Sequence, residues 1–253
     1  MKNINLKNKN ILVTGADGFI GSHLVERLIK LNCSVHAMSL YNSHNTWGWL
    51  DDLDNEAKSK IKVTSGDIRD YKYVKNCLKG VDIVFHLASL IAIPYSYHSP
   101  NSYVQTNIQG TLNILEASLD SNIKKFIHTS TSEVYGDTTK VPINENTQVI
   151  SKSPYSATKI AADQLAYSYF STYDLPVSII RPFNTYGPRQ SNRAIIPTIL
   201  TQVLTGKKNI KLGSIYPTRD FSYVDDTVNG FIEIARHDTS IGEVINIGSG
   251  YEI

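Results

Sequence analysis

The chain has 253 residues, of which 41% are hydrophobic and 19% charged, so it can bury a sizeable core as one large or two small domains. A net charge of +2, with scattered lysines and arginines, argues against a nucleic-acid or membrane partner. Two isolated cysteines and the lack of a long apolar segment predict a reduced, cytoplasmic protein without a disulfide framework.

The first expected element is a strand over 10–14, which leads into three glycines at Gly-x-x-Gly-x-x-Gly spacing and then into a helical pattern. Gly15 permits a tight turn, Gly18 lets the backbone approach a pyrophosphate at the helix amino terminus, and Gly21 lets the helix pack closely on the strand. Such a turn can also be purely structural. Its position between a strand and a helix favours a dinucleotide site.

The second expected strand, 34–38, should end beside the ribose of a bound adenosine. An acidic residue there would bind the ribose 2′-hydroxyl. The chain has Ser39 and then Leu40, followed by neither an acid nor an arginine, so this position does not decide between NAD and NADP. The next loop holds both tryptophans, Trp47 and Trp49, which either pack the loop onto the sheet or line a pocket.

A third strand is expected over 61–65, and Asp67 follows it, where a doubly wound sheet presents groups to a nucleotide base. Asp70 is interpreted as the cap of a helix that runs through Leu78.

The nearly continuous apolar run 81–87 predicts a parallel strand that is buried on both faces. It ends in Ala88 and Ser89, which are small enough to leave room for cofactor phosphates or ribose. We interpret His86 as a hydrogen-bonded core histidine, because no second ligand has suitable spacing, and we predict no metal site.

One long helix over 100–119 and a strand over 125–129 come next, and Ser130, Thr131, Ser132 and Glu133 follow that strand. Strand and helix have then alternated five times, which predicts a right-handed, doubly wound parallel sheet. Every candidate group follows a strand, so these groups should meet at the carboxyl edge of the sheet, where such folds bind ligands.

Tyr155 and Lys159 lie four residues apart in a predicted helix that begins at Pro154, so they should share one face. A cation beside the phenol is expected to lower the pKa of Tyr155 and prepare it as the base for a sugar hydroxyl. The alternative is a solvated pair on a surface helix. The other candidates at the same edge favour a site.

The last part of the chain breaks the alternation after a sixth strand at 175–180. The Pro/Gly-rich run 182–189 marks the predicted boundary between a dinucleotide-binding Rossmann domain, 1–181, and a smaller substrate-binding part, 182–253. Helices are expected over 195–204 and up to Ala235, with a strand over 244–247.

These residues resemble the extended short-chain dehydrogenases/reductases, specifically the nucleotide-sugar epimerases and dehydratases. The resemblance covers essentially the whole chain and rests on the glycine turn and on Gly66-Asp67, His86-Leu-Ala88, Asn107, Ser130 to Gly136, Tyr155-x-x-x-Lys159, Arg181 to Asn184, and Arg219-Asp220-Phe221. It implies a Rossmann-like α/β fold with a smaller carboxyl-terminal substrate-binding part, in which 182–253 is a partial nucleotide-sugar-binding domain interleaved with the first. Similar proteins continue further, which suggests a truncated chain. It also implies a nucleotide-sugar substrate and a homodimer formed through the helices near 100–119 and 154–173, with Tyr167, Tyr169 and Tyr173 on the joining faces.

The resemblance also assigns roles to single residues. Lys159 would hold the nicotinamide ribose, Thr131 would bind the sugar 4-hydroxyl, and the cofactor would be NAD, with NADP left open. The implied cofactor contacts are Gly15, Asp17, Gly18, Phe19, Ile20, Gly21, Ser39, Asp67, Ile68, Leu87, Ala88, Ser89, Asn107, Ser130, Tyr155, Lys159 and Pro182. The implied substrate contacts are Ser132, Asn184, Arg193 and Arg219, and the implied catalytic residues are Thr131, Ser132, Glu133, Tyr155 and Lys159.

Within this group, Glu133 favours a 4,6-dehydratase, which needs a second base for the sugar C5 proton. Many similar dehydratases carry Asp immediately before this Glu. Here the position is Ser132, as in GDP-mannose dehydratases, which leaves the acid for the C6 hydroxyl unassigned. UDP-glucuronate decarboxylases share the Thr-Ser-Glu triad and are the main alternative, and a 4-epimerase is another.

Two further observations bear on the activity. The loop from Trp47 to Asp51 resembles that of bacterial GDP-N-acetylglucosamine 4,6-dehydratases of legionaminic acid biosynthesis, which makes GDP-N-acetylglucosamine the expected substrate. A non-catalytic cofactor-binding protein is the alternative from another class. The presence of Tyr155, Lys159 and Glu133 together argues against it.

Overall fold

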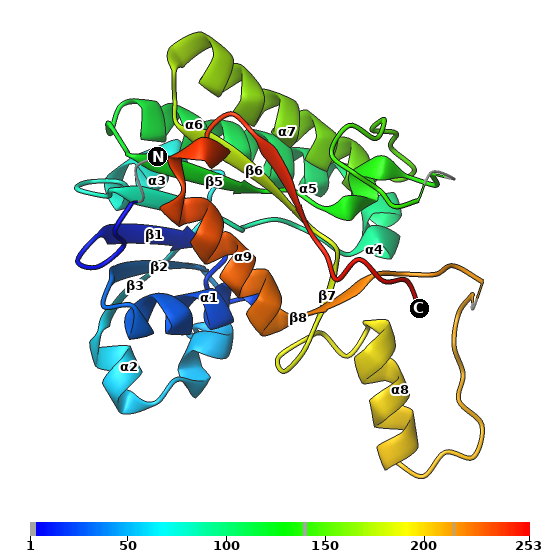
Figure 1. Ribbon diagram of the computed structural model, residues 1–253. Coiled ribbons are helices and arrows are strands. Elements are labelled where there is room, and N and C mark those ends of the chain that lie inside the picture. Colours follow the sequence, from blue (N-terminus) through cyan, green and yellow to red (C-terminus); the bar gives the residue numbers. More distant parts are fainter. Residues whose placement is uncertain (1–3, 139–140, 215) are drawn as a thin grey trace.

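A seven-stranded parallel sheet forms the centre of the molecule in the computed structural model, which describes residues 4–138, 141–214 and 216–253 (Figure 1). The strand order is β3-β2-β1-β4-β5-β6-β9, which confirms the predicted doubly wound α/β fold. The strands are β1 (Asn10–Thr14), β2 (Ser34–Leu40), β3 (Ile61–Gly66), β4 (Ile83–His86), β5 (Lys125–Thr129), β6 (Val177–Pro182) and β9 (Val244–Ile247).

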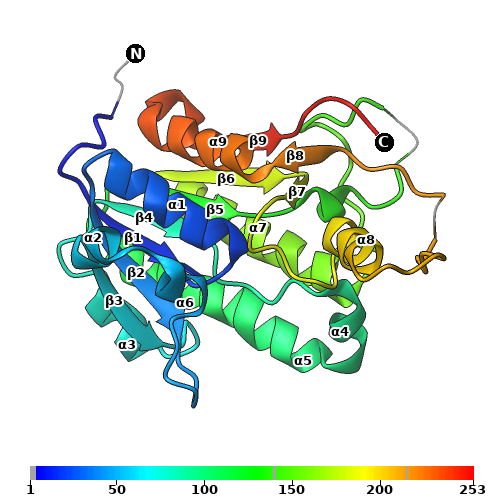
Figure 2. The ribbon, with the colours of Figure 1, turned by 90° about the horizontal axis from the view of Figure 1, so that it is seen from below.

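Helices cover both faces of this sheet. Helices α1 and α9 pack together on one face, and α3, α6 and α7 lie on the other (Figure 2). All residues of β4 and β6 are buried, as expected for strands covered on both sides. The α-helices are α1 (Phe19–Lys30), α2 (Asn55–Ser59), α3 (Tyr71–Cys77), α4 (Ile93–His98), α5 (Pro100–Tyr103), α6 (Gly110–Leu119), α7 (Pro154–Tyr173), α8 (Ile195–Leu204) and α9 (Val224–Arg236). The shorter helical turns are η1 (Gly48–Asp52), η2 (Val104–Gln109), η3 (Ser132–Tyr135) and η4 (Asp238–Ser240).

The winding of the sheet reverses between β1 and β4. The chain first moves from β1 outward to β2 and β3, and then returns to add β4, β5 and β6 on the other side. Thr14 at the end of β1 lies between Met38 of β2 and His86 of β4. A crevice opens at the carboxyl ends of the strands at such a reversal, so the fold places a binding site directly after Thr14.

The glycine turn after β1 allows three segments to come close together. Gly15 has φ +66, and a Cβ there would lie 2.8 Å from the backbone nitrogen of Ala88, beyond the end of β4. A Cβ on Gly21 would lie 2.1 Å from the carbonyl oxygen of Gly15. The tight turn predicted at Gly15 and the close packing predicted at Gly21 are therefore confirmed.

The helix predicted over 100–119 is found without a break, but it contains a π-helical stretch that the sequence did not predict. The segment comprises α5, the π-helical turn η2 and α6. A π turn inserts an extra residue, and this shifts the faces of the helix on either side of it. Asn107 lies in this turn, accepts a hydrogen bond from the Leu90 nitrogen at 2.8 Å and donates one to the Leu90 oxygen at 2.9 Å. These tertiary bonds hold Asn107 inward, and an apolar spacing pattern does not reveal them.

The segment after residue 182 is divided between two places. Strand β9 extends the main sheet beside β6, and α9 packs against α1, whereas α8 lies away from the sheet (Figure 1). A separate two-stranded sheet joins β7 (Asn184–Tyr186) to β8 (Phe221–Tyr223). This arrangement agrees with interleaving, and the division into two domains at 181/182 stays a prediction.

The expected dimer faces contain both exposed and buried tyrosines. Tyr167 and Tyr173 on α7 are exposed, but Tyr169 is buried, with its hydroxyl bonded to Glu116 of α6. Tyr169 therefore stabilises the packing of α6 against α7 within one chain, and the homodimer stays a prediction. Among the described residues, no helix combines the length and apolar character needed to cross a lipid bilayer.

Candidate active site

A cavity of about 1220 Å³ opens at the carboxyl edge of the sheet, where the winding reverses. It contains most of the residues that the sequence predicted for the site. The predicted cofactor residues that line it are Gly15, Asp17, Gly18, Phe19, Ile20, Gly21, Ser39, Asp67, Ile68, Leu87, Ala88, Ser89, Ser130, Tyr155, Lys159 and Pro182. The predicted catalytic and substrate residues that also line it are Thr131, Glu133, Asn184 and Arg193.

Three predicted site residues are not part of the cavity wall. Asn107 is buried behind the wall, and Ser132 begins the short helix η3. Arg219 exchanges backbone hydrogen bonds of 2.9 Å with Ile253, and its guanidinium donates to the Thr218 oxygen. The fold thus brings Thr131 and Glu133 to the cavity but leaves Arg219 outside it.

The cavity also contains residues that the sequence did not assign. Trp49, which could have packed or lined a pocket, lines the cavity, as do Tyr95, His98, Arg189 and Gln190. The last four lie in loops or short helices beyond the recognised motifs, so neither spacing nor composition distinguished them.

Helix α7 places Tyr155 and Lys159 on one wall of the cavity. The helix begins at Pro154, as predicted, and Ser153 caps it. The Ser153 hydroxyl accepts from the Ser156 nitrogen at 3.1 Å, and the Ser156 hydroxyl accepts from the Ser153 nitrogen at the same distance. This double cap fixes the first turn, so the position of Tyr155 is set by local sequence.

The pKa of Tyr155 differs from the value expected for a phenol beside a lysine. Burial raises the pKa of Tyr155 well above its ordinary value, the Thr131 hydroxyl acts in the opposite direction, and the charge of Glu133 raises the pKa further. Burial lowers the pKa of Lys159 to about 8, and the charge of Asp163 opposes this shift. The sequence predicted a lowered pKa for Tyr155, and this prediction is wrong, because the pKa is raised. Burial is the largest influence on the pKa of Tyr155. The Lys159 ammonium donates to the Thr129 carbonyl oxygen at 2.6 Å.

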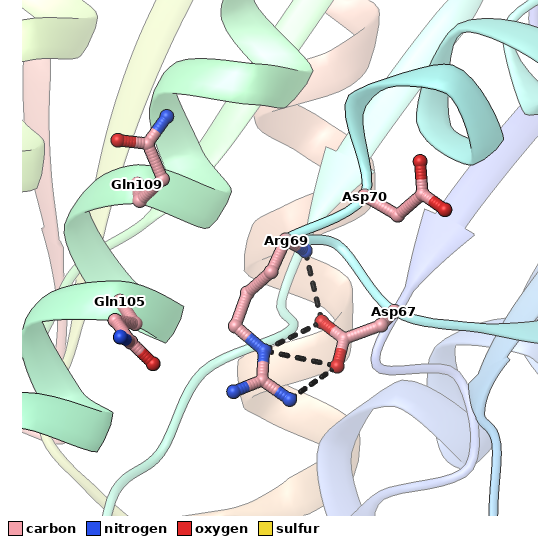
Figure 3. Close-up of a pocket in the computed structure, with 5 residues that line it drawn as sticks. All are labelled: Asp67, Arg69, Asp70, Gln105 and Gln109. Carbon is pink, nitrogen blue, oxygen red and sulfur yellow. Dashed lines mark hydrogen bonds and ion pairs between the residues drawn. The ribbon is translucent and has the colours of Figure 1, made fainter.

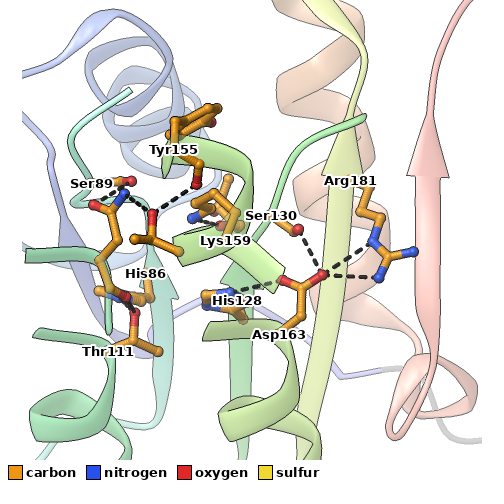
Figure 4. Close-up of polar contacts among 12 residues, drawn as sticks. His86, Ser89, Thr111, His128, Ser130, Tyr155, Lys159, Asp163 and Arg181 are labelled. Atoms are coloured by element: carbon orange, nitrogen blue, oxygen red, sulfur yellow. Dashed lines mark hydrogen bonds and ion pairs between the residues drawn. The ribbon is translucent and has the colours of Figure 1, made fainter. Parts of the chain in front are cut away.

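A buried polar cluster under the catalytic wall joins α7 to β5 and β6 (Figure 4). The carboxylate of Asp163 accepts from the Ser130 hydroxyl at 2.8 Å and from the Arg181 guanidinium at 2.9 and 3.2 Å, and it lies 3.3 Å from the His128 ring. Burial would raise the pKa of Asp163, but the neighbouring His128 ring and the charge of Arg181 lower it overall. Asp163 lies one helical turn after Lys159 on α7. By anchoring Asp163, the cluster also fixes the position of Lys159 along the cavity wall.

We expect Asp163→Asn to lower the free energy of unfolding by about 3–5 kcal/mol, because Arg181 then remains as a buried, unpaired charge. The lowered pKa of Asp163 means that its contribution is present in full above its ordinary value of 3.8 and is lost as pH falls through the folded pKa. Urea unfolding at neutral and at progressively more acidic pH measures both effects.

Asp174→Asn is the matched control for this change. Asp174 is exposed and ends the same helix with φ +55, a conformation that asparagine adopts readily. If Asp163→Asn lowers the free energy of unfolding no more than Asp174→Asn does, the buried cluster does not stabilise the fold as proposed.

His86 behaves as the sequence predicted. Its ring is buried and lies 2.8 Å from the Thr14 hydroxyl. On the other side it lies 3.0 Å from the Thr111 hydroxyl (Figure 4). Burial lowers the pKa of His86 well below its usual range, and the charges of His128 and Lys159 add to the shift. Since Thr14 also accepts from the Ala88 nitrogen at 3.1 Å, His86 helps to join the ends of β1 and β4.

The residues of the glycine turn fit a dinucleotide. Helix α1 begins at Phe19, and its N-cap residue, Gly18, provides no side-chain cap, so the first backbone N–H groups are available to an anion in the cavity. The missing side chains at Gly15 and Gly21 allow the loop to lie close against β4 and α1.

A second, open hollow of about 490 Å³ adjoins the cavity beyond β3 and is lined by Asp67, Arg69, Asp70, Gln105 and Gln109 (Figure 3). Arg69 folds onto Asp67, with guanidinium-to-carboxylate distances of 2.5 to 3.0 Å. The Asp70 carboxylate accepts from the Tyr73 nitrogen at 3.1 Å and caps α3, as predicted.

A glycine turn and a buried Tyr-Lys pair on the carboxyl edge of one doubly wound sheet are typical of short-chain dehydrogenases/reductases. Over residues 12–253 the chain matches the family described as GDP-mannose 4,6 dehydratase. The chain belongs to this family of nucleotide-sugar dehydratases and epimerases, which confirms the resemblance found in the sequence.

Known relatives include both dehydratases and epimerases. The low-salt glycan biosynthesis protein Agl12 of Haloferax volcanii is 34% identical over 249 residues, which cover 96% of this chain and 78% of that protein. The UDP-N-acetylglucosamine 4-epimerase of Methanobrevibacter ruminantium M1 has a TM-score of 0.89 and 34% identity, covering 98% of this chain and 78% of that chain. DesIV, a dTDP-glucose 4,6-dehydratase of Streptomyces venezuelae solved with NAD bound, has a TM-score of 0.85 and 32% identity, covering 96% and 77%.

Proposed function

We propose that the protein is an NAD-dependent nucleotide-sugar 4,6-dehydratase. The observation that carries the proposal is the position of Glu133 beside Tyr155. Both residues line the same cavity, and the carboxylate is close enough for its charge to raise the pKa of the phenol. A dehydratase needs one base for a hydroxyl proton and another for a carbon-bound proton, and these two groups meet both needs.

The cofactor residues keep the roles that the resemblance implies. NAD, when bound, supplies the centre that takes a hydride from sugar C4 and later returns it to C6. The glycine turn would hold the pyrophosphate at the start of α1, and Lys159 would hold the nicotinamide ribose. Asn107 acts from behind the wall, because its side chain fixes the Leu90 backbone and donates to the Thr158 hydroxyl at 3.0 Å.

The protein side chains move two protons. Thr131 orients the sugar 4-hydroxyl, and Tyr155 takes the proton from its oxygen as C4 becomes a ketone. The ketone acidifies the C5 proton, which Glu133 removes. Asp17 and Asp67, the other described carboxylates that line the cavity, lie near the ends of β2 and β3, so we assign to Glu133 the return of this proton to the C6 hydroxyl, which leaves as water. When the hydride returns to C6, C5 takes a proton from solvent, and Tyr155 releases to solvent the proton that it took from the 4-hydroxyl, so the protons balance.

The proposed substrate is GDP-N-acetylglucosamine. Two observations support it: the resemblance of the loop from Trp47 to Asp51 to dehydratases of that substrate, and membership of a family described by a GDP-sugar dehydratase. Asn184 and Arg193 line the cavity on the side of the carboxyl-terminal segment and are proposed to bind the sugar nucleotide.

A 4-epimerase is the second candidate. Ser132 replaces the acid that many dehydratases carry there, and the relative with a TM-score of 0.89 is a 4-epimerase. An epimerase returns the hydride to C4 and leaves C5 untouched, so exchange of the C5 proton separates the two activities.

The test is incubation of the purified protein with NAD and, separately, GDP- and UDP-N-acetylglucosamine in deuterated solvent. We expect a product that has lost one water and carries deuterium at C5, detected by mass spectrometry, with the GDP sugar preferred. Heat-denatured protein is the control. A new sugar nucleotide of unchanged mass, separated from the substrate by chromatography, would establish the epimerase instead. Release of carbon dioxide from UDP-glucuronate would establish the decarboxylase.

A further inference from the structure

The end of β2 lacks the acidic residue that commonly binds the adenosine ribose, but a carboxylate lies there nevertheless. It belongs to Asp17 of the glycine turn. Asp17 Oδ2 accepts a hydrogen bond from the Leu40 nitrogen at 3.2 Å and also interacts with the Ser39 hydroxyl. Asp17, Ser39 and Leu40 all line the cavity. The glycine turn thus supplies an acid at the end of the neighbouring strand.

The tryptophan loop holds Asp17 in this position. The Asp17 carbonyl oxygen accepts from the Trp49 nitrogen at 3.1 Å. Gly48 has φ +55, and a Cβ there would lie 2.7 Å from the same oxygen, so only glycine fits between the two loops. Leu50 is fully buried and anchors the loop in the core. Asp17 is therefore fixed through its backbone by Trp49 and through its carboxylate by Leu40.

Resting on the proposed NAD-dependent function, we propose that Asp17 selects NAD over NADP. In a doubly wound sheet, a dinucleotide over the glycine turn brings its adenosine ribose to the end of the second strand. The Asp17 carboxylate accepts a hydrogen bond from the ribose 2′-hydroxyl. A 2′-phosphate at the same place would meet a fixed negative charge.

The nearby arginine does not offset this charge. NADP sites commonly provide an arginine for the 2′-phosphate, and Arg69 lines the cavity at the end of β3. Its guanidinium is already paired with Asp67 through contacts of 2.5, 2.9 and 3.0 Å (Figure 3). The ion pair with Asp67 neutralises the Arg69 guanidinium, which could otherwise bind the 2′-phosphate of NADP.

The test compares the dissociation constants of NADH and NADPH, measured by fluorescence titration, for the wild type, Asp17→Asn and Asp52→Asn. We expect the wild type to prefer NADH by about 100-fold or more, and Asp17→Asn to reduce that preference by about tenfold or more, through weaker NADH and tighter NADPH binding. Asp52→Asn removes the same charge from an exposed residue at the end of η1, outside the cavity wall, and should leave the preference unchanged.

The outcomes separate this inference from the proposed function. If the wild type binds neither dinucleotide, the proposed function itself fails. If it binds NADH but Asp17→Asn keeps the wild-type preference, or if the wild type prefers NADPH, only the role of Asp17 is overturned. Asp17→Ser, which keeps a small hydrogen-bond acceptor for Leu40, provides the same comparison if Asp17→Asn does not fold. The 2′-deoxy analogue of NADH, titrated against the wild type, should bind about tenfold more weakly than NADH, and equal binding would also overturn the role.

Discussion

Tyr155→Phe is expected to lower turnover by about 10²- to 10⁴-fold, because the phenol is the base that takes the proton from the sugar hydroxyl. The ring remains, so the packing of Tyr155 edge-on against Tyr103 is kept. Lys159 and the glycine turn are untouched, and NADH affinity should therefore stay within about twofold of the wild type. Product formation by mass spectrometry and NADH binding by fluorescence measure the two effects.

Tyr103→Phe is the control for losing a buried tyrosine hydroxyl at this wall. Tyr103 donates to the Ala92 oxygen at 2.6 Å and does not line the cavity. Its loss should cost about 1 kcal/mol of stability with little change in turnover. Turnover by Tyr155→Phe equal to that of Tyr103→Phe would remove Tyr155 from the reaction.

The sequence predicted those parts of the fold that are determined by residues close together in the chain. The glycine spacing after β1, the Pro154 start of α7 and the apolar run of β4 each follow from short-range rules, and each is found where expected. Parallel winding then placed Thr131 and Glu133 at the same edge as the glycine turn. This is why most of the candidate site could be predicted without knowing any contact.

The features that sequence reasoning missed depend on contacts between distant residues. The Asp17 carboxylate reaches the nitrogen of Leu40, and Asp163 pairs with Arg181 across two elements, and neither pairing leaves a periodic signal. The π turn at Asn107 is accompanied by tertiary bonds to Leu90 rather than by a helix-breaking residue. The pKa of Tyr155 was predicted from one neighbour, whereas burial, which sequence does not reveal, controls it.

Glu133→Gln is expected to lower the formation of dehydrated product by about 10²- to 10⁴-fold while C4 oxidation continues. The amide keeps the size of the side chain but cannot accept the C5 proton. Because the charge of Glu133 raises the pKa of Tyr155, its removal makes the phenol easier to ionise, so the first step should not slow. The variant should therefore accumulate reduced nicotinamide, visible by absorbance in a single turnover, without deuterium entering C5.

Glu145→Gln makes the same chemical change outside the cavity, where the Glu145 carboxylate accepts from the Asn246 nitrogen at 2.9 Å. It should dehydrate the sugar at nearly the wild-type rate. If Glu133→Gln and Glu145→Gln lose water equally fast, Glu133 is not the C5 base. If Glu133→Gln instead blocks C4 oxidation as well, the carboxylate acts in the first step rather than the second, and the separation of roles between Tyr155 and Glu133 is wrong.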